Sequence, residues 1–234
     1  MGKLTDDLTV NAYKMAYSQG YDHSYPNENI VRLEASYLRD SKGVCLDYGY
    51  GFGENLIHLA KNGYSMHGID IDETLIDKVN HKISSRNITL DFTPELTTMD
   101  GSTFRLPYKD NSFDCLLSNQ TVYLLADEGK IQLLLEEFYR ILKPGAKMLI
   151  TMMGEQNYNC FEGEYLGNNV YEYDDKSVMN NVKGDFTHRY YILHSEPHIN
   201  WLFKNFNIDE VGSWDNIYRG VSGHHYVIMC HKPK

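Results

Sequence analysis

The chain has 234 residues and a net charge of −10, from 22 Lys and Arg against 32 Asp and Glu. That length suits a single domain with a substantial core. The acidic balance, without any run of Lys or Arg, disfavours a large nucleic acid as partner. No apolar run approaches the ~20 residues that a membrane helix needs, so we expect no membrane insertion.

The first residues give no sign of a targeting segment. Met1 to Asp7 reaches two acids before any apolar stretch, so we expect no signal peptide and a cytoplasmic protein. The four cysteines are far apart and form no C-x-x-C pair, which predicts buried free thiols and no metal site.

The segment before the first strand is rich in tyrosine. Apolar residues from Leu8 to Ala16 predict one helix, followed by a polar loop over residues 18–26. Asn27 can cap a second helix. We therefore expect a helical N-terminal region over residues 1–42.

A strand, a glycine turn and a helix follow. Val44 to Leu46 is an unbroken apolar run, as in a parallel strand buried on both faces. Gly49, Gly51 and Gly53 remove three Cβ atoms, which lets the backbone turn tightly against a ligand. The spacing is not that of a dinucleotide fingerprint, because the sixth position from Gly49 is Glu54, and no Gly-Lys-Ser/Thr follows for a phosphate loop.

The next predicted strand, residues 64–72, ends in acids. Asp70 stands 17 positions after Gly53, at the carboxyl end of this strand. A carboxylate there offers two oxygens to the two hydroxyls of a ribose. The strand and its acid therefore predict a nucleoside site beside the glycine turn.

The pattern Asp47-x-Gly49-x-Gly51-x-Gly53, with Asp70 after it, resembles that of the class I S-adenosylmethionine (SAM)-dependent methyltransferases. The resemblance implies SAM as cofactor and S-adenosylhomocysteine (SAH) as product. It gives Asp70 the ribose contact and packs Ile71 against the adenine. The other implied cofactor contacts near the turn are Asp47, Gly49, Gly51 and Gly53.

Later segments extend the resemblance. A third strand within residues 88–100 leads to Asp100-Gly101, where the family places an acid that accepts from the adenine amino group; the alternative is a plain Asp-Gly turn. The Leu106-Pro107-Tyr108 turn precedes a fourth strand that ends at Asn119, near the transferred methyl group. No Asn/Asp-Pro-Pro-aromatic motif follows, so the subclass that methylates nucleic-acid bases is not supported.

The resemblance implies an α/β fold with a doubly wound, mostly parallel sheet of seven strands and an antiparallel last strand. We expect one methyltransferase domain over residues 1–234. Its parts are an N-terminal helical lid (1–42), a SAM-binding core (43–153), a substrate-binding insertion after strand five (154–194) and a C-terminal helix with a strand pair (195–234). In the lid, Tyr25 and Arg32 are implied cofactor contacts. The alternative for Arg32 is a solvated charge on a docking helix.

Methyl transfer from a sulfonium is an in-line displacement that needs orientation, and a base where the acceptor is a hydroxyl. Histidine titrates near the working pH. We favour His188 as this base, with Tyr190 and Tyr191 beside it in sequence. Asp174 and Asp175 are adjacent acids in a polar loop and are not expected to bind a metal.

The predicted function is SAM-dependent methyl transfer to an oxygen of a small polar acceptor, such as a sugar, nucleotide-sugar or phosphorylated metabolite. The segment from Tyr25 to the glycine turn looks like methyltransferases of bacterial surface-polysaccharide pathways. Alternatives are N-methylation of a small amine, or an RNA methyltransferase. A non-catalytic SAM- or nucleotide-binding module is the alternative from another class. We expect a small-molecule partner and no nucleic acid, and leave a homodimer open.

Overall fold

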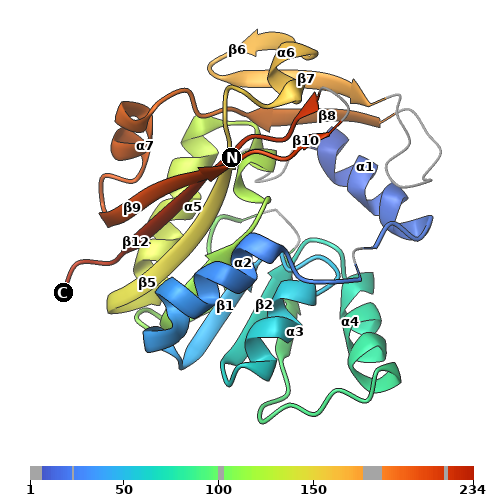
Figure 1. Cartoon of the computed structure of the whole chain (residues 1–234), viewed down its shortest axis with the longest axis vertical. Coiled ribbons are helices and arrows are strands. Elements are labelled where there is room, and N and C mark those ends of the chain that lie inside the picture. The colour runs from blue at the N-terminus through green and yellow to red at the C-terminus, as the bar shows by residue number, and fades with distance from the viewer. Residues whose placement is uncertain (1–6, 23, 100–102, 176–185, 219–220) are drawn as a thin grey trace.

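The computed structural model describes residues 7–22, 24–99, 103–175, 186–218 and 221–234. Its centre is a seven-stranded sheet (Figure 1). In spatial order the strands are β3 (Glu95–Thr98), β2 (Ser65–Asp70), β1 (Val44–Tyr48), β4 (Phe113–Ser118), β5 (Leu142–Met153), β12 (His225–His231) and β9 (Asn207–Trp214). Strand β12 pairs antiparallel with both β5 and β9, while the other pairs are parallel. The predicted fold class is confirmed.

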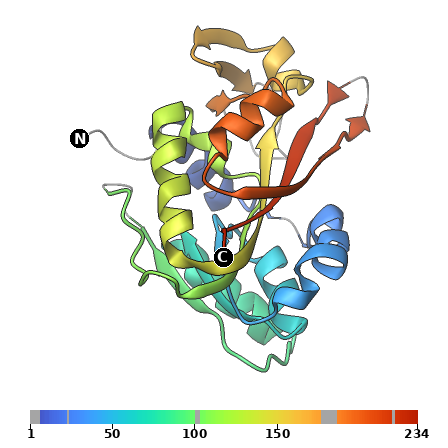
Figure 2. The ribbon, with the colours of Figure 1, turned by 90° about the vertical axis from the view of Figure 1, so that its left-hand side faces the viewer.

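Helices cover both faces of this sheet (Figure 2). The helices are α1 (Asp7–Ser18), α2 (Glu28–Leu33), α3 (Glu54–Lys61), α4 (Thr74–Ser85), α5 (Glu128–Ile141), α6 (Tyr158–Phe161) and α7 (Glu196–Leu202). Helix α2 continues through a π-helical turn, Glu34–Leu38, and a 3₁₀ turn, Arg39–Ser41.

The two faces form separate apolar cores because successive strand residues point in opposite directions. Leu116 packs into the core formed with α5 and α7. Its neighbours Cys115 and Leu117 pack into the core formed with α2, α3 and α4. The apolar runs of the sequence therefore correspond to strands buried on both faces.

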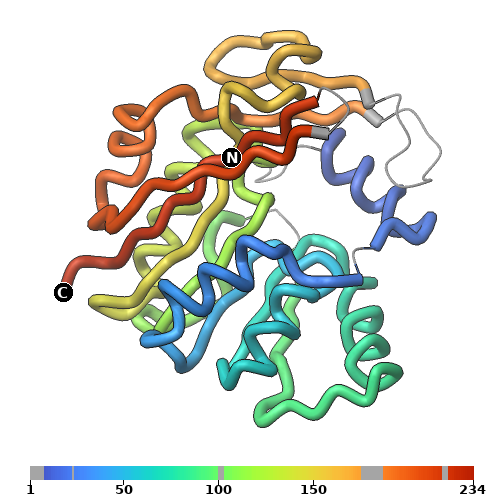
Figure 3. Tube along the Cα trace, in the orientation of Figure 1, coloured from blue at the N-terminus to red at the C-terminus, as the bar shows by residue number. Residues whose placement is uncertain are grey.

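A second, three-stranded antiparallel sheet follows β5 in the chain and is separate from the main sheet (Figure 3). It consists of β6 (Glu164–Gly167), β7 (Val170–Asp175) and β8 (Phe186–Tyr191). A short hairpin, β10 (Ile217–Tyr218) and β11 (Val221–Ser222), lies between β9 and β12 in the chain. Residues 154–194, which showed no strong period in the sequence, thus contain regular structure.

Helix α1 is held against this second sheet. The Thr9 hydroxyl accepts a hydrogen bond from the Arg189 backbone N–H at 3.0 Å. The N-terminal region therefore joins the second sheet to the main one, since α2 packs on the main sheet. Within the described residues we find no helix with the length and apolar character needed to cross a bilayer.

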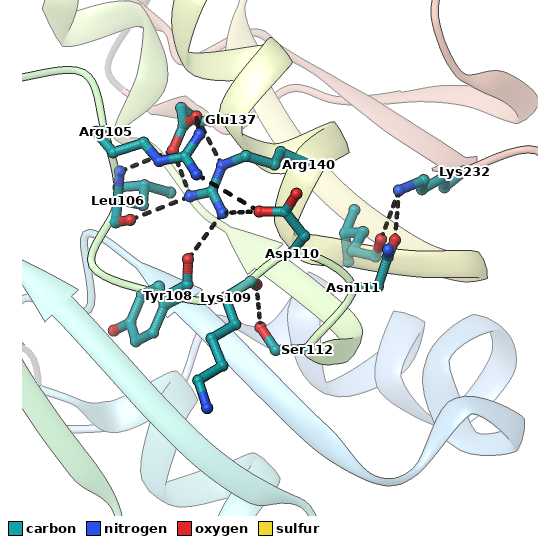
Figure 4. Close-up of polar contacts among 11 residues, drawn as sticks. Arg105, Leu106, Tyr108, Lys109, Asp110, Asn111, Ser112, Glu137, Arg140 and Lys232 are labelled. Carbon is teal, nitrogen blue, oxygen red and sulfur yellow. Dashed lines mark hydrogen bonds and ion pairs between the residues drawn. The ribbon is translucent and has the colours of Figure 1, made fainter.

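A polar cluster ties the Leu-Pro-Tyr turn to α5 (Figure 4). The Arg140 guanidinium donates to Glu137 at 2.6 Å and to Asp110 at 2.7 Å. It also donates to the backbone carbonyl oxygens of Leu106 and Tyr108. This cluster lies before β4 begins, at the amino edge of the sheet, so it stabilises the fold away from the strand ends.

Candidate functional site

The glycine turn after β1 adopts a backbone that favours glycine at three positions. Gly49, Gly51 and Gly53 have φ angles of 75°, 52° and 73°. A Cβ on Gly49 would overlap the Thr121 side chain, and one on Gly53 would lie 2.8 Å from Val79 Cγ2. The turn is therefore closely packed on its protein side.

Asp70 is held against this turn at the carboxyl end of β2. Its Oδ2 accepts a hydrogen bond from the Gly51 N–H at 2.9 Å, and its Oδ1 accepts one from the Ile71 N–H at 2.7 Å. Burial raises the pKa of Asp70, while these backbone donors lower it. The carboxylate is thus fixed where two neighbouring strands end.

Asp47 is buried behind the turn. Desolvation by burial, followed by the charge of Asp70, raises the pKa of Asp47 to about 8. Its Oδ2 has no hydrogen-bond partner among the described residues. The buried carboxyl group is therefore largely protonated near neutral pH in the unliganded protein.

The N-terminal region lies close to the same turn. Lys82 of α4 donates to the Phe52 carbonyl oxygen at 3.0 Å and pairs with Asp22 at 3.0 Å and Glu54 at 2.7 Å. The Asn27 N–H donates to Asn55 Oδ1 at 2.9 Å. These contacts hold Asp22 and Asn27 beside the glycine turn.

A cavity of about 770 Å³ runs along the carboxyl edge of the sheet. Its size lies within the usual range for small-molecule sites. The predicted cofactor residues that line it are Tyr25, Gly49, Gly51, Gly53, Asp70, Ile71 and Asn119. Asp47 is not among the lining residues, and Asp100 and Gly101 lie outside the described residues.

Two predicted site residues lie elsewhere. The Arg32 side chain pairs with Glu28 and both are about three-quarters exposed, at 74% and 76%. His188 is buried on β8, with its ring 5.5 Å from that of Tyr13 and 5.7 Å from that of Tyr190. Neither Arg32 nor His188 lines the cavity.

The cavity continues beyond the cofactor residues into a part rich in tyrosine and asparagine. Sequence reasoning assigned none of these side chains to a site. They are Tyr13, Tyr123, Tyr158, Tyr190, Asn157, Asn159, Asn216 and His225. We call the part of the cavity lined by these residues the tyrosine-rich end.

His225 and Tyr123 are in contact at this end. The His225 Nδ1 lies 2.7 Å from the Gly223 carbonyl oxygen, and its Nε2 lies 3.4 Å from the Tyr123 hydroxyl. Burial lowers the pKa of His225 to about 4. The imidazole is therefore neutral at physiological pH.

Comparison with known proteins agrees with this geometry. Residues 46–150, which contain the glycine turn, Asp70 and Asn119, match a family model described as a methyltransferase domain. The chain is 31% identical over 160 residues to a sarcosine/dimethylglycine N-methyltransferase from Aphanothece halophytica, covering 68% of this chain and 54% of that protein. It is 25% identical over 146 residues to a phosphoethanolamine N-methyltransferase from Plasmodium falciparum, covering 62% and 52%.

The chain thus spans about half the length of these curated relatives. Among solved structures, a SAM-dependent methyltransferase from Methanosarcina mazei has a TM-score of 0.68 at 21% identity, covering 89% of this chain and 99% of that one. At this identity the likeness shows the fold.

Residues 46–150 therefore resemble a methyltransferase domain, and the chain has the fold of a class I methyltransferase, for which SAM is the methyl donor and SAH the product. The site fits that cofactor, because the tight glycine turn and the fixed Asp70 carboxylate line one part of the cavity.

Proposed function

We propose that this protein transfers the methyl group of SAM to the nitrogen of a small amine bound at the tyrosine-rich end. The observation that carries the proposal is the continuity of the cavity from Asp70 to Tyr123 and Tyr190. A donor on the glycine turn and an acceptor among the tyrosines would therefore share one continuous cavity, as an in-line displacement requires.

The residues that line the cavity beside the glycine turn support SAM binding there. Asp70 would accept from the ribose hydroxyls, and Ile71 with Met99 would pack against the adenine. Gly49, Gly51 and Gly53 would let the backbone approach the methionine part. The assignments of Asp100, Gly101 and Arg32 remain predictions from the family pattern.

SAM supplies an electrophilic methyl group on a sulfonium. The chain's own residues contribute orientation and the exclusion of water. Tyr123 and His225 line the cavity and are themselves buried, so they would help to exclude water from the point of transfer.

The tyrosine-rich end supports an amine. Aromatic faces attract ammonium groups, and Tyr13, Tyr123 and Tyr190 come from three different elements to line one space. Two of the relatives are named as N-methyltransferases, which agrees with this chemistry. We also propose that residues 1–42 act as the lid and residues 154–194 as the acceptor-binding insertion, because both segments contribute lining residues.

Methylation of a sugar or nucleotide-sugar hydroxyl is a second candidate. Asn157, Asn159 and Asn216 line the same end, and their amides suit hydroxyl groups as donors and acceptors. No observation supports a surface-polysaccharide pathway, and we do not propose one.

A binding assay followed by a transfer assay tests the proposal. Thermal unfolding with SAM, SAH or NAD should show stabilisation by SAM and SAH and none by NAD. Methyl uptake should then be screened across small amines and nucleotide-sugars. Stabilisation by NAD alone would overturn the cofactor assignment, and transfer only to hydroxyl compounds would favour the second candidate.

A further inference from the structure

The contact between His225 and Tyr123 defines the direction of a hydrogen bond inside the cavity. The Gly223 carbonyl oxygen only accepts, so the His225 Nδ1 at 2.7 Å from it must carry the ring proton. In the neutral ring the Nε2 then has no proton and accepts from the Tyr123 hydroxyl at 3.4 Å.

The surroundings of the ring support its neutral state. Tyr123 faces it from the short helix η3 (Val122–Leu125), and Trp214 covers it from β9, with ring centres 5.8 Å apart. Burial is the main cause of the lowered pKa of His225, and the neighbouring His224 lowers it further. The hydrogen bond to the Gly223 carbonyl oxygen and the charge of Asp215 raise the pKa by less, and the other titratable neighbour is Tyr123. The acceptor role of Nε2 therefore persists across the neutral pH range.

Because its proton is directed to His225, the Tyr123 oxygen keeps its lone pairs for another partner. Tyr123 lies shortly after the end of β4 and lines the cavity with Asn119. This is the strand end to which the family pattern assigns the transferred methyl group. A hydrogen-bond acceptor at this place suits a group that donates an N–H while its own lone pair attacks.

We propose that Tyr123, oriented by His225, accepts a hydrogen bond from the N–H of a primary or secondary amine and directs the amine lone pair toward the methyl group. Tyr123 is then a catalytic residue and His225 a positioning residue. The inference rests on the proposed function and deepens it by naming the class of amine.

The step balances without a further reagent. The lone pair of the neutral amine forms the N–C bond while the C–S bond breaks and its electron pair stays on sulfur. The nitrogen keeps its N–H to Tyr123 during transfer, and the resulting ammonium then loses a proton to water. A tertiary amine has no N–H while its lone pair attacks, so it cannot make this contact.

Kinetics of Tyr123→Phe on matched primary, secondary and tertiary amines test the proposal, with Tyr139→Phe as control. Tyr139 packs against Phe206 and Lys232, away from the cavity lining. We expect wild-type protein to prefer primary and secondary amines. Tyr123→Phe should lower kcat/KM for these by about 10- to 100-fold, the effect of one hydrogen bond to a group that becomes charged, with the SAM Kd and the tertiary amine rate unchanged.

His225→Leu should lower kcat more than it raises KM, because the Tyr123 hydroxyl remains but has lost the acceptor that orients it. His81→Leu, at an exposed residue of α4, is its control. Histidine ¹⁵N shifts of the unliganded protein give a readout without turnover. They should show a protonated Nδ1 and an unprotonated Nε2 on His225, and remain informative if a variant fails to fold.

Three results would overturn the inference. These are an Nε2-protonated His225, an unchanged amine preference in Tyr123→Phe, and a wild-type preference for tertiary amines. If the wild-type protein methylates no amine at all, both the proposed function and the role of Tyr123 are wrong. If the wild type methylates amines and Tyr123→Phe does so equally well, only the present inference fails.

Discussion

Asp70 Oδ2 accepts a hydrogen bond from the Gly51 N–H at 2.9 Å, which joins the end of β2 to the glycine turn after β1. The two residues are 19 positions apart in the chain, and they meet because β1 and β2 pair in parallel with Tyr48 beside Ile69. One carboxylate therefore both braces the turn and faces the ligand cavity.

Asp70→Asn should weaken SAM binding by about 10- to 100-fold, because a charged acceptor for two hydroxyls is replaced by a neutral amide. Titration calorimetry with SAM measures this. Asp77→Asn removes an exposed acid from α4 and serves as control. Equal SAM affinity of Asp70→Asn and wild-type protein would show that Asp70 does not bind the ribose.

Gly53→Ala should destabilise the fold more than Gly63→Ala. Both residues have positive φ, 73° and 88°, so both variants bear a backbone cost of about 1 kcal/mol. Only at Gly53 would the new Cβ meet a neighbour, Val79 Cγ2 at 2.8 Å, which adds about 1–3 kcal/mol of overpacking. Urea unfolding compares the two variants. Equal losses in the free energy of unfolding would show that the Val79 side chain moves aside at no cost.

The stability of the unliganded protein should fall as pH rises from about 4 to about 8. The pKa of Asp47 is raised to about 8 in the folded protein, against about 4 in an unfolded chain. Between these values the folded state binds more protons than the unfolded state, so the free energy of unfolding decreases with pH.

Asp47→Asn should flatten that decrease, whereas Asp77→Asn should leave it as it is. Chemical unfolding at several pH values between 5 and 9 measures both variants. Some slope should remain in Asp47→Asn because burial also raises the pKa of Asp70. If the free energy of unfolding of Asp47→Asn changed with pH just as in the wild type, Asp47 would not be protonated in the folded protein.

Arg140→Met should destabilise the protein by about 3 kcal/mol without changing SAM affinity. Its side chain is 13% exposed, and removing it leaves Glu137, also nearly buried at 12%, without its main cation. Arg105→Met, which removes an exposed partner of the same acid, should cost at most about 1 kcal/mol. Thermal unfolding compares the two variants. Similar losses of stability would show that Arg140 contributes no more than Arg105 to the cluster in Figure 4.

The cofactor half could be predicted because its signals are local. Three glycines within five residues and an acid at the next strand end require only that two consecutive parallel strands be neighbours, which the structure confirms. The tyrosine-rich end has no such signal. Tyr123 and His225 are 102 positions apart, and His225 reaches the cavity because β12 pairs antiparallel with β5, opposite Met153.

His188 illustrates the limit of local reasoning in the other direction. It shares one face of β8 with Tyr190, because side chains two apart on a strand point the same way. That face packs against Tyr13 of α1, a contact that depends on how α1 docks and that no pattern around His188 indicates. The three strands within residues 154–194 were missed because each has only four to six residues, too few to show a clear period.

The most direct test is transfer of a labelled methyl group from SAM to a primary or secondary amine, followed by mass spectrometry of the product. We predict that the wild-type protein labels at least one such amine on nitrogen and that Asp70→Asn at the same SAM concentration does so far more slowly. SAM binding with no label transferred to any amine or hydroxyl compound would contradict the account and indicate a non-catalytic binding module.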